Sequence, residues 1–213
     1  MKIEIFSDFM CPYCYIGLKS LERAIEKSGV KPEIEFLAYE LNPNIKSEHK
    51  KLKDTIKEKH NLNDYEVQGT MNRIVKYAKE EGLDYNMEDA IAANTHLAHL
   101  AMKYAKSVNK DHEFEEELMK AAFIKGEDVG DIEVINKIAS EIGINVDEML
   151  EFIDMDSTKA LVLDDNHKAE ALGVKVIPTY RIDEDRIIEG TLDTAEWIEI
   201  LNGAPVLDLL KLY

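Results

Sequence analysis

The sequence predicts an α/β fold in which a long helical segment interrupts a small sheet. Three observations support this prediction. Residues 1–6 form a short apolar run with β-branched side chains, which is typical of a strand. From about residue 47 to residue 171, apolar residues recur almost entirely at helical spacing. Residues 174–189 then return to a β-like pattern.

The composition limits the class of protein. The chain has 213 residues, of which 45% are hydrophobic, so we expect one large domain or a domain that contains an inserted one. No run of about 18 apolar residues predicts a transmembrane helix. The net charge of −17 argues against a nucleic-acid partner and against anionic membranes, because both need a basic surface.

The first part of the chain predicts a βαβ unit. After the strand at residues 1–6, apolar residues between Tyr15 and Ile25 recur at helical spacing. Residues 32–39 begin with alternating polar and apolar side chains and predict a second strand. A β-α-β connection is nearly always right-handed and joins parallel strands, so we expect these strands to be parallel. The proline-containing residues 41–44 mark the end of the unit.

The middle of the chain predicts a series of helices. In order, the predicted helical stretches cover residues 50–59, 71–82, 91–105, 114–122, 132–143, 146–153 and 157–173. The alanine-rich stretch 91–105 is expected to be the most buried of the set. Asn145 and Glu148 match a capping box, and Ser157 is the expected cap of the last helix.

The last part of the chain predicts a hairpin followed by a helix. Residues 174–182 and 186–189 are the two predicted strands, and Pro178 lies inside the first. A proline cannot donate to a β-ladder, so Pro178 must lie at a strand start or an edge, with its peptide bond either trans or cis. Asp193 and Glu196 form a second capping-box pattern and predict the start of the closing helix.

The sequence Cys11-Pro12-Tyr13-Cys14 lies where the first strand ends and the first helix begins. Unpaired N–H groups and the helix dipole favour a thiolate at this position. Pro12 suits the first turn, because its missing N–H would have no partner there. Cys11 is therefore the predicted nucleophile, and Cys14 is predicted to resolve the mixed disulfide that Cys11 forms. Tyr13 lies beside both sulfurs.

Two other interpretations of the cysteine pair are an inert disulfide and half of a zinc site. A structural zinc site needs four ligands, and the chain has no second cysteine pair. His96 and His99 could complete a Cys2His2 set, but they lie far along the chain inside a helical stretch. We therefore predict a redox pair and no metal site.

Five segments together resemble a known family. They are residues 7–17, 40–43, 94–99, 126–131 and 173–179. On these segments the chain resembles the DsbA-like thioredoxin superfamily and, within it, the FrnE-like cytoplasmic branch. The resemblance implies a thioredoxin-like fold with a helical domain inserted between the βαβ and ββα halves. Residues 1–46 and 172–213 would form the discontinuous thioredoxin-like domain, and residues 47–171 the inserted helical domain.

The resemblance also implies a site. The Ile177–Pro178 bond would be cis and face the cysteines, with the backbone of Ile177 available to a substrate. His96 and His99 are most simply interpreted as polar side chains that are hydrogen-bonded within the helical domain. Their position in the family also allows one of them to line a groove above Cys11. The candidate groove residues are Asn42, His96, His99 and Tyr180.

The chain departs from the family pattern at two places. Relatives usually carry a buried acidic residue six positions before the first cysteine, where this chain has Ile5. The proton of Cys14 therefore needs another acceptor, for which water, Glu4 and Asp8 are the candidates. Residues 190–193 are Gly-Thr-Leu-Asp, whereas the FrnE-like branch commonly has Gly-Ala-Gln-Pro.

The predicted function is a thiol–disulfide oxidoreductase that acts on protein or small-molecule disulfides through Cys11 and Cys14. We expect no bound cofactor; glutathione is a candidate co-substrate, although the negative charge of the chain disfavours its long-range attraction. One alternative is a glutathione-dependent isomerase or transferase of the kappa or 2-hydroxychromene-2-carboxylate type, whose members commonly carry serine at the position of Cys11. Another is a non-catalytic binder with an apolar groove.

The cysteine content also bears on location. The two cysteines are both in the motif, which leaves none for a structural disulfide. This usage and the lack of a basic-then-apolar leader predict a cytoplasmic protein. The expected partners are protein thiols and disulfides or glutathione, and the sequence leaves open whether the chain is a monomer or a homodimer.

Overall fold

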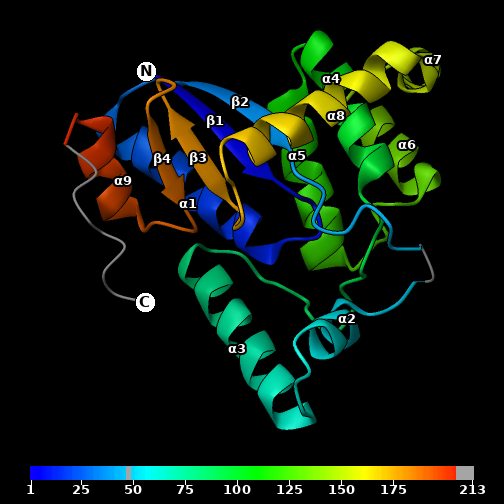
Figure 1. The fold of residues 1–213 in the computed structure, drawn as a ribbon, viewed down its shortest axis with the longest axis horizontal. Helices are drawn as coiled ribbons and strands as arrows, with labels where there is room; N and C mark the ends of the chain where they lie inside the picture. Colours follow the sequence, from blue (N-terminus) through cyan, green and yellow to red (C-terminus); the bar gives the residue numbers. More distant parts are fainter. Residues whose placement is uncertain (47–48, 205–213) are drawn as a thin grey trace.

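The computed structural model describes residues 1–46 and 49–204. Residues 47–48 and 205–213, which the predicted domain boundaries assign to the helical and thioredoxin-like parts respectively, lie outside the described residues. The fold is α/β, with a four-stranded sheet in the order β2-β1-β3-β4 and helices on both of its faces (Figure 1).

The N-terminal half forms the predicted βαβ unit. Its elements are β1 (Lys2–Ser7), α1 (Pro12–Ser28) and β2 (Glu33–Ala38). β1 and β2 are parallel, and Ile3 pairs with Ile34 while Ser7 pairs with Ala38. Gly29 ends α1 in the left-handed conformation, which glycine adopts at little cost. The carboxyl end of β1 therefore delivers the chain directly to the cysteine motif.

The C-terminal half supplies the other two strands and the closing helix. These are β3 (Thr179–Ile182), β4 (Arg186–Glu189) and α9 (Thr194–Leu201). β3 is antiparallel to both β1 and β4. The strand predicted at residues 174–182 is too long. The observed strand, β3, begins at Thr179, directly after the cis Ile177–Pro178 bond. The capping box predicted from Asp193 and Glu196 is confirmed at the start of α9.

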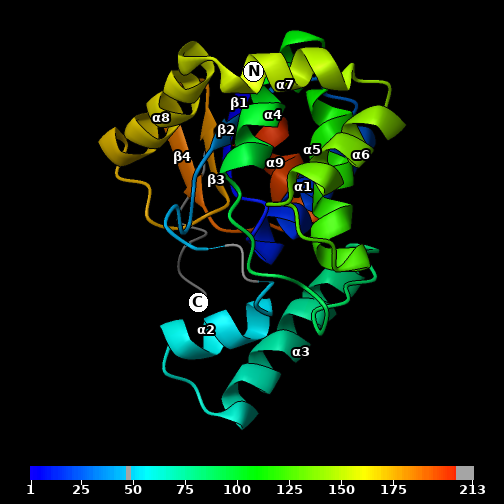
Figure 2. The ribbon, with the colours of Figure 1, turned by 90° about the vertical axis from the view of Figure 1, so that its right-hand side faces the viewer.

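The helices between β2 and β3 form the inserted part of the fold. They are α2 (Leu52–Lys59), α3 (Asp64–Glu80), α4 (His96–Ser107), α5 (Asp111–Lys120), a π-helical turn (Ala121–Lys125), α6 (Ile132–Glu141), α7 (Val146–Asp154) and α8 (Asp156–Ala171). α2 and α3 form an arm that extends away from the sheet (Figure 2). Across residues 1–46 and 49–204, no helix combines the length and apolar character needed to cross a bilayer.

Three predicted helix starts are wrong. The helix predicted over residues 71–82 begins at Asp64, where Asn63 and Glu66 form a capping box. The helix predicted from residue 91 begins at His96, because Ile91 is extended and forms a β-bridge with Lys51. The last insert helix begins at Asp156 with Met155 as its N-cap, so Ser157 lies inside the helix rather than capping it. Asn145 does cap α7, where its side chain accepts a hydrogen bond from the Glu148 N–H.

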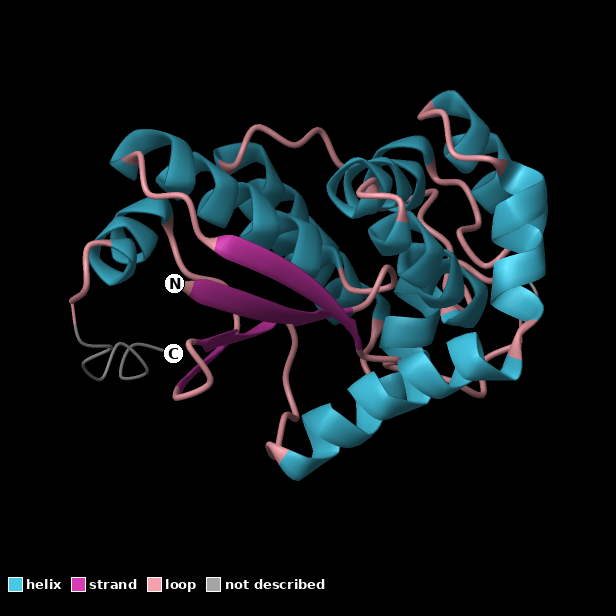
Figure 3. Ribbon diagram, turned by 90° about the horizontal axis from the view of Figure 1, so that it is seen from above, coloured by secondary structure: helices cyan, strands magenta, loops and turns pink. Residues whose placement is uncertain are grey.

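Helices cover both faces of the sheet. α1 and α9 pack together behind the sheet in Figure 1, and α8 crosses in front of it beside β2; the view from above separates these layers (Figure 3). The face covered by α1 and α9 buries Ile3, Ile5, Tyr180 and Trp197 completely or almost so. Tyr180 packs edge-on against Trp197, with ring centroids 4.7 Å apart.

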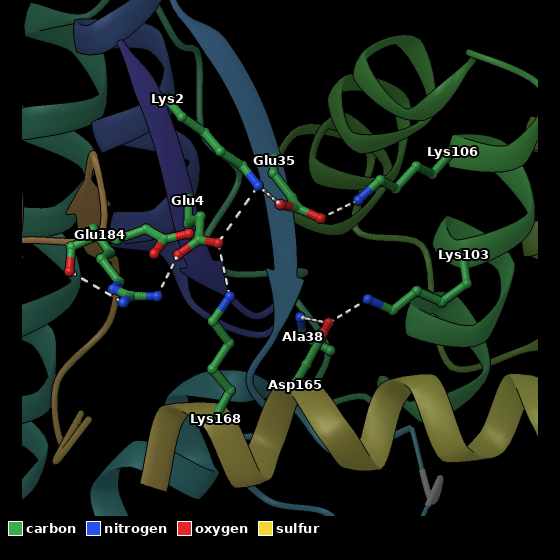
Figure 4. Close-up of polar contacts among 10 residues, drawn as sticks. Lys2, Glu4, Glu35, Ala38, Lys103, Lys106, Asp165, Lys168 and Glu184 are labelled. Atoms are coloured by element: carbon green, nitrogen blue, oxygen red, sulfur yellow. Dashed lines mark hydrogen bonds and ion pairs between the residues drawn. The ribbon is translucent and has the colours of Figure 1, made fainter. Parts of the chain in front are cut away.

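Ion pairs join the insert to the edge of the sheet (Figure 4). Asp165 of α8 accepts a hydrogen bond of 2.7 Å from the Ala38 N–H and pairs with Lys103 of α4. Glu35 of β2 pairs with Lys2 and with Lys106 of α4. An uncovered edge strand exposes unpaired backbone groups, so these side chains protect β2 and fix the insert against it.

Candidate active site

The cysteine motif forms the turn between β1 and α1. Cys11 is the N-cap of α1 in an extended conformation, and Pro12 is the first helical residue. The Cys11 N–H donates to the carbonyl of Asp8 at 2.9 Å, and the Cys14 N–H donates to the carbonyl of Cys11 at 3.0 Å. No acidic residue lies in the first turn of α1, so nothing there opposes a negative charge at the helix end.

The cis Ile177–Pro178 bond lies against this turn. The Cys11 Sγ is 3.7 Å from the carbonyl oxygen of Ile177, to which the thiol donates. Gly17 allows this approach, because a Cβ at that position would lie 2.3 Å from Tyr180 Oη and 3.2 Å from Pro178 Cγ. The absence of a side chain on α1 thus lets the proline loop pack over the motif.

The two thiols have different surroundings. Both cysteines are free, and the exposed fractions are 7% for Cys11 and 2% for Cys14. Burial raises the pKa of Cys14 well above its usual value, and the neighbouring Cys11 and the charge of Asp8 add to the effect. Cys14 is therefore a thiol at neutral pH and needs a proton acceptor before it can attack.

Aromatic residues from the insert line the other side of the motif. Tyr85 donates a hydrogen bond of 2.8 Å to the carbonyl of Pro12, and burial raises the pKa of its hydroxyl well above the usual value. Its ring stacks between Tyr15 and Phe123, at centroid distances of 6.1 Å and 5.3 Å. Tyr85 lies between the predicted helical stretches 71–82 and 91–105, and no local pattern marks it as a neighbour of the cysteines.

Tyr13 is only partly buried and faces the arm. Burial raises the pKa of its hydroxyl, and the positive charge of Arg73 on α3 partly offsets this effect. Tyr77, one turn beyond Arg73, also acts on the Tyr13 hydroxyl electrostatically. Tyr13 thus lies between the motif and the arm.

The two histidines of α4 lie in different environments. His96 is 42% exposed at its side chain, and its Nδ1 is 2.9 Å from Glu40 Oε1. It lines an open pocket of about 540 Å³ together with Glu40, Pro43, Ile45, Asn94, Leu97 and Gly130. His99 is 4% exposed, and its Nε2 is 3.6 Å from Asp8 Oδ1. His99 therefore lies in the interior behind the motif.

The other two groove candidates, Asn42 and Tyr180, do not line this pocket. Asn42 is exposed but is not among the residues that line the pocket. The prediction for Tyr180 is wrong: its side chain is completely buried because β3 turns it toward α1 and Trp197. Two residues near the site, Tyr85 and Glu115, were not predicted from the sequence. Asp8 also lies near the site, and the sequence analysis named it only as a candidate proton acceptor.

The comparisons with known proteins identify the family and the fold of the chain. A model of the DSBA-like thioredoxin domain matches residues 2–210. The chain belongs to the DSBA-like thioredoxin domain family. A curated relative, the uncharacterised protein YwbO of Bacillus subtilis (strain 168), is 27% identical over 194 residues, which cover 89% of this chain and 90% of YwbO.

Solved structures share the fold. A probable DsbA oxidoreductase from Streptomyces coelicolor has a TM-score of 0.87 at 22% identity and covers 95% of this chain and 88% of its own. The cytosolic disulfide reductase DsbM from Pseudomonas aeruginosa has a TM-score of 0.69 at 15% identity, covering 95% and 97%. A 2-hydroxychromene-2-carboxylate isomerase also has a TM-score of 0.69, at 14% identity, and covers 89% of each chain. At these identities the likeness concerns the fold alone.

Proposed function

We propose that this protein of the DSBA-like family is a thiol–disulfide oxidoreductase in which Cys11 attacks and Cys14 resolves. The observation that carries the proposal is the asymmetry of the two thiols. The Cys11 Sγ lies at the start of α1 and contacts the Ile177 carbonyl, whereas Cys14 is enclosed one turn deeper and holds its proton. Only the first sulfur is placed to receive a substrate.

The proposed reaction has two exchanges. In the first, the Cys11 thiolate attacks a substrate disulfide, forms a Cys11–substrate bond and expels one substrate thiolate. In the second, Cys14 loses its proton and its thiolate attacks the Cys11 sulfur. The Cys11–Cys14 bond forms, the mixed disulfide breaks and the second substrate thiolate leaves. The substrate gains two electrons and the protein loses two; the same steps run in reverse when the protein acts as an oxidant.

The surroundings of the site favour a disulfide carried on a peptide or a small molecule. Val176 precedes Ile177, whose carbonyl contacts Cys11, and it is 49% exposed, so it offers an apolar contact next to the cis-proline bond. The residue 40–45 loop, which lines the open pocket with His96, is tied to the motif because the Leu41 N–H donates to Asp8 at 2.6 Å. Glutathione stays a candidate co-substrate, with the pocket as its place of contact.

A cytoplasmic location and membership of the FrnE-like branch are parts of the same proposal. Both cysteines of the chain belong to the motif, a usage that suits a reducing compartment. One of the proteins with a similar fold is a cytosolic disulfide reductase. A reductase that keeps its own pair reduced needs a thiol or dithiol donor, and protein thiols or glutathione supply that chemistry.

The test compares Cys11→Ser and Cys14→Ser with the unchanged chain in insulin reduction, followed by turbidity. Both variants should lose turnover. After acid quenching, mass spectrometry should find a trapped mixed disulfide on Cys14→Ser and none on Cys11→Ser. The reverse pattern would exchange the two roles, and full activity in both variants would refute the redox function. The isomerase alternative needs no second thiol, so isomerase activity retained by Cys14→Ser would favour it instead.

A further inference from the structure

A tyrosine of the insert reaches the backbone of the cysteine motif and takes no part in the exchange steps above. Tyr85 lies in the segment between α3 and α4, 73 positions from Pro12 along the chain. Its hydroxyl donates a hydrogen bond of 2.8 Å to the Pro12 carbonyl. This hydrogen bond is a direct link from the insert to the first turn of α1, where the two cysteines lie.

The surroundings of Tyr85 fix the place of its hydroxyl. Tyr85 is buried, and its ring stacks between those of Tyr15 and Phe123. Its backbone is held as well, because the following N–H, that of Asn86, donates a hydrogen bond of 2.7 Å to the Phe123 carbonyl. Phe123 belongs to the π-helical turn Ala121–Lys125, and single π-helical turns are frequent at functional sites. A buried ring that is stacked on both faces cannot turn away without opening a void, so the hydroxyl is preorganised.

The first turn of α1 has few N–H groups to offer a sulfur atom. Cys11 is the N-cap, and an N-cap side chain accepts from the N–H of the second or third helical residue. These residues are Tyr13 and Cys14. The Cys14 N–H already donates to the Cys11 carbonyl, and Pro12 has no N–H. The Tyr13 N–H is therefore the donor that remains for the Cys11 sulfur.

The Pro12 carbonyl and the Tyr13 N–H belong to the same peptide unit. A hydrogen bond donated to a carbonyl polarises its peptide unit and strengthens the hydrogen bond that the N–H of that unit donates. By donating to Pro12, Tyr85 thus makes the Tyr13 N–H a better donor. The gain is largest when the acceptor is charged, because hydrogen bonds to ionised groups are about twice as strong as neutral ones.

A charged acceptor at Cys11 exists only in the reduced protein. As a thiol, Cys11 donates to the Ile177 carbonyl, with 3.7 Å between Sγ and the oxygen. In a Cys11–Cys14 disulfide the sulfur is neutral and a weak acceptor. The thiolate of Cys11 is the form that gains from a stronger Tyr13 N–H. A contact that favours this thiolate therefore favours the reduced protein over the disulfide.

Tyr85 stays a donor at neutral pH. Burial raises the pKa of its hydroxyl well above the usual value, and the neighbouring Cys11, Tyr15 and Cys14 add to the effect. Its stacking partner Tyr15 donates to Glu116 Oε1 at 2.9 Å, so the Tyr15 hydroxyl does not compete for the Pro12 carbonyl. The hydrogen of the Tyr85 hydroxyl is therefore committed to the motif.

We propose that Tyr85 is a positioning residue that makes the protein a stronger disulfide oxidant, because its hydroxyl acts through the Pro12–Tyr13 peptide unit to stabilise the Cys11 thiolate. The inference rests on the proposed oxidoreductase function. It concerns the equilibrium in which the protein disulfide and two glutathione thiols give the protein dithiol and glutathione disulfide. The Cys11–Cys14 bond breaks, the glutathione S–S bond forms, and two electrons and two protons pass to the protein. Cys11 releases one of these protons to water when it ionises.

The test measures this equilibrium constant in glutathione buffers for the unchanged full chain and for Tyr85→Phe, which loses one oxygen and keeps its ring in the stack. Tyr15→Phe is the matched control, because it removes the same oxygen from the same stack, but from a hydroxyl that donates to Glu116 rather than to the motif. Tyr85→Phe should shift the equilibrium toward the protein disulfide by about threefold to tenfold, the range of one hydrogen bond. Tyr15→Phe should leave it unchanged. Both variants lose a hydrogen bond, so a loss of stability alone does not separate them.

Two further measurements follow the thiolate itself. In Cys14→Ser, the Cys11 thiolate fraction at a given pH, read from ultraviolet absorbance, should fall when Tyr85→Phe is added. In the unchanged chain, the NMR signal of the Tyr13 amide proton should move downfield as this thiolate forms.

Three results would each overturn the inference and leave the oxidoreductase standing. They are an equilibrium constant or thiolate fraction that Tyr85→Phe leaves unchanged, an equal shift in Tyr15→Phe, and a Tyr13 amide that does not respond to the thiolate. Failure of the unchanged chain to form a Cys11–Cys14 disulfide in oxidised glutathione would instead refute the redox function.

Discussion

The redox turn and the helical insert contribute to the same site by different routes. The turn supplies consecutive residues: Ser7 ends β1, Cys11 caps α1, and local backbone hydrogen bonds connect Asp8, Cys11 and Cys14. The insert supplies residues from far along the chain. Tyr85 reaches Pro12 across 73 positions and Glu115 reaches Ser7 across 108.

The difference separates two kinds of information. The turn determines which bond chemistry is available, because two thiols at a helix start can exchange disulfides whatever lies around them. The insert determines the environment in which those thiols lose and gain protons, because it brings His99 against Asp8 and Glu115 against Ser7. If this comparison is right, changes at the junction should affect folding most, and changes inside each region should have distinct signatures.

Asp165→Ala tests the junction and should have the largest effect. The change removes the partner of the mostly buried Lys103 and the acceptor for the Ala38 N–H on the edge strand. An unpaired buried charge costs about 3–5 kcal/mol, so the free energy of unfolding in urea should fall by about that amount. Glu58→Ala, which breaks the exposed Lys50–Glu58 pair, should cause no measurable loss. Equal effects of the two substitutions would mean that this contact does not join the regions.

Glu115→Gln tests the interior of the insert through pH. The folded-state pKa of Glu115 is raised to about 8 from an ordinary 4.5, so the folded state holds an extra proton between these values. That contribution to stability is complete below the ordinary value and is lost as pH rises through the folded one. Glu115→Gln lacks this loss. Its stability relative to the unchanged chain should rise between about pH 5 and pH 8, by up to about 1.4 kcal/mol per pH unit.

The neighbouring Glu116 provides the control. Burial alone would raise its pKa, but Lys19, Tyr15 and Lys120 together outweigh burial and hold the pKa below the usual value. A depressed pKa stabilises the fold above the ordinary value, so Glu116→Gln should lose stability at neutral pH without the rising trend. The measurement is urea unfolding at a series of pH values. Parallel pH profiles for Glu115→Gln and the unchanged chain would contradict a raised pKa at Glu115.

The comparison also explains which features could be predicted from the sequence. The βαβ unit, the hairpin and the redox motif depend on neighbouring residues, so periodicity and spacing were sufficient. Whether His96 or His99 lies near the cysteines depends on how α4 packs, and the helical pattern does not encode that rotation. The groove role of Tyr180 failed for the same reason, because its burial follows from contact with Trp197 across the layer. The π-helical turn at Ala121–Lys125 has no sequence sign at all.

Gly17→Ala should have the smallest effect on folding and a specific effect on function. Its Cβ would lie 2.3 Å from the buried Tyr180 hydroxyl, which is packed and cannot easily move. Overpacking of this kind costs about 1–3 kcal/mol, of which the better helix propensity of alanine returns about 1. Urea unfolding should therefore show a net loss of roughly 1 kcal/mol. The rate at which Cys11 attacks the aromatic disulfide dithiobis(nitrobenzoate) and releases its first coloured thiolate should also fall, because α1 and the cis-proline loop must move apart beside Cys11.

Gly69→Ala is the matched control in the insert. Gly69 lies inside α3 with no atom within 4 Å of its would-be Cβ, so the same substitution meets no neighbour there. It should stabilise the chain by roughly 0.5–1 kcal/mol through helix propensity alone. It should leave unchanged the rates of both thiolate releases from dithiobis(nitrobenzoate), the first by attack of Cys11 and the second by resolution through Cys14. A slower first release in Gly69→Ala would show that the conformational order of α3 affects the reactivity of the cysteines. A normal release in Gly17→Ala would show that the loop tolerates displacement from α1, so that close contact between them is not what makes Cys11 reactive.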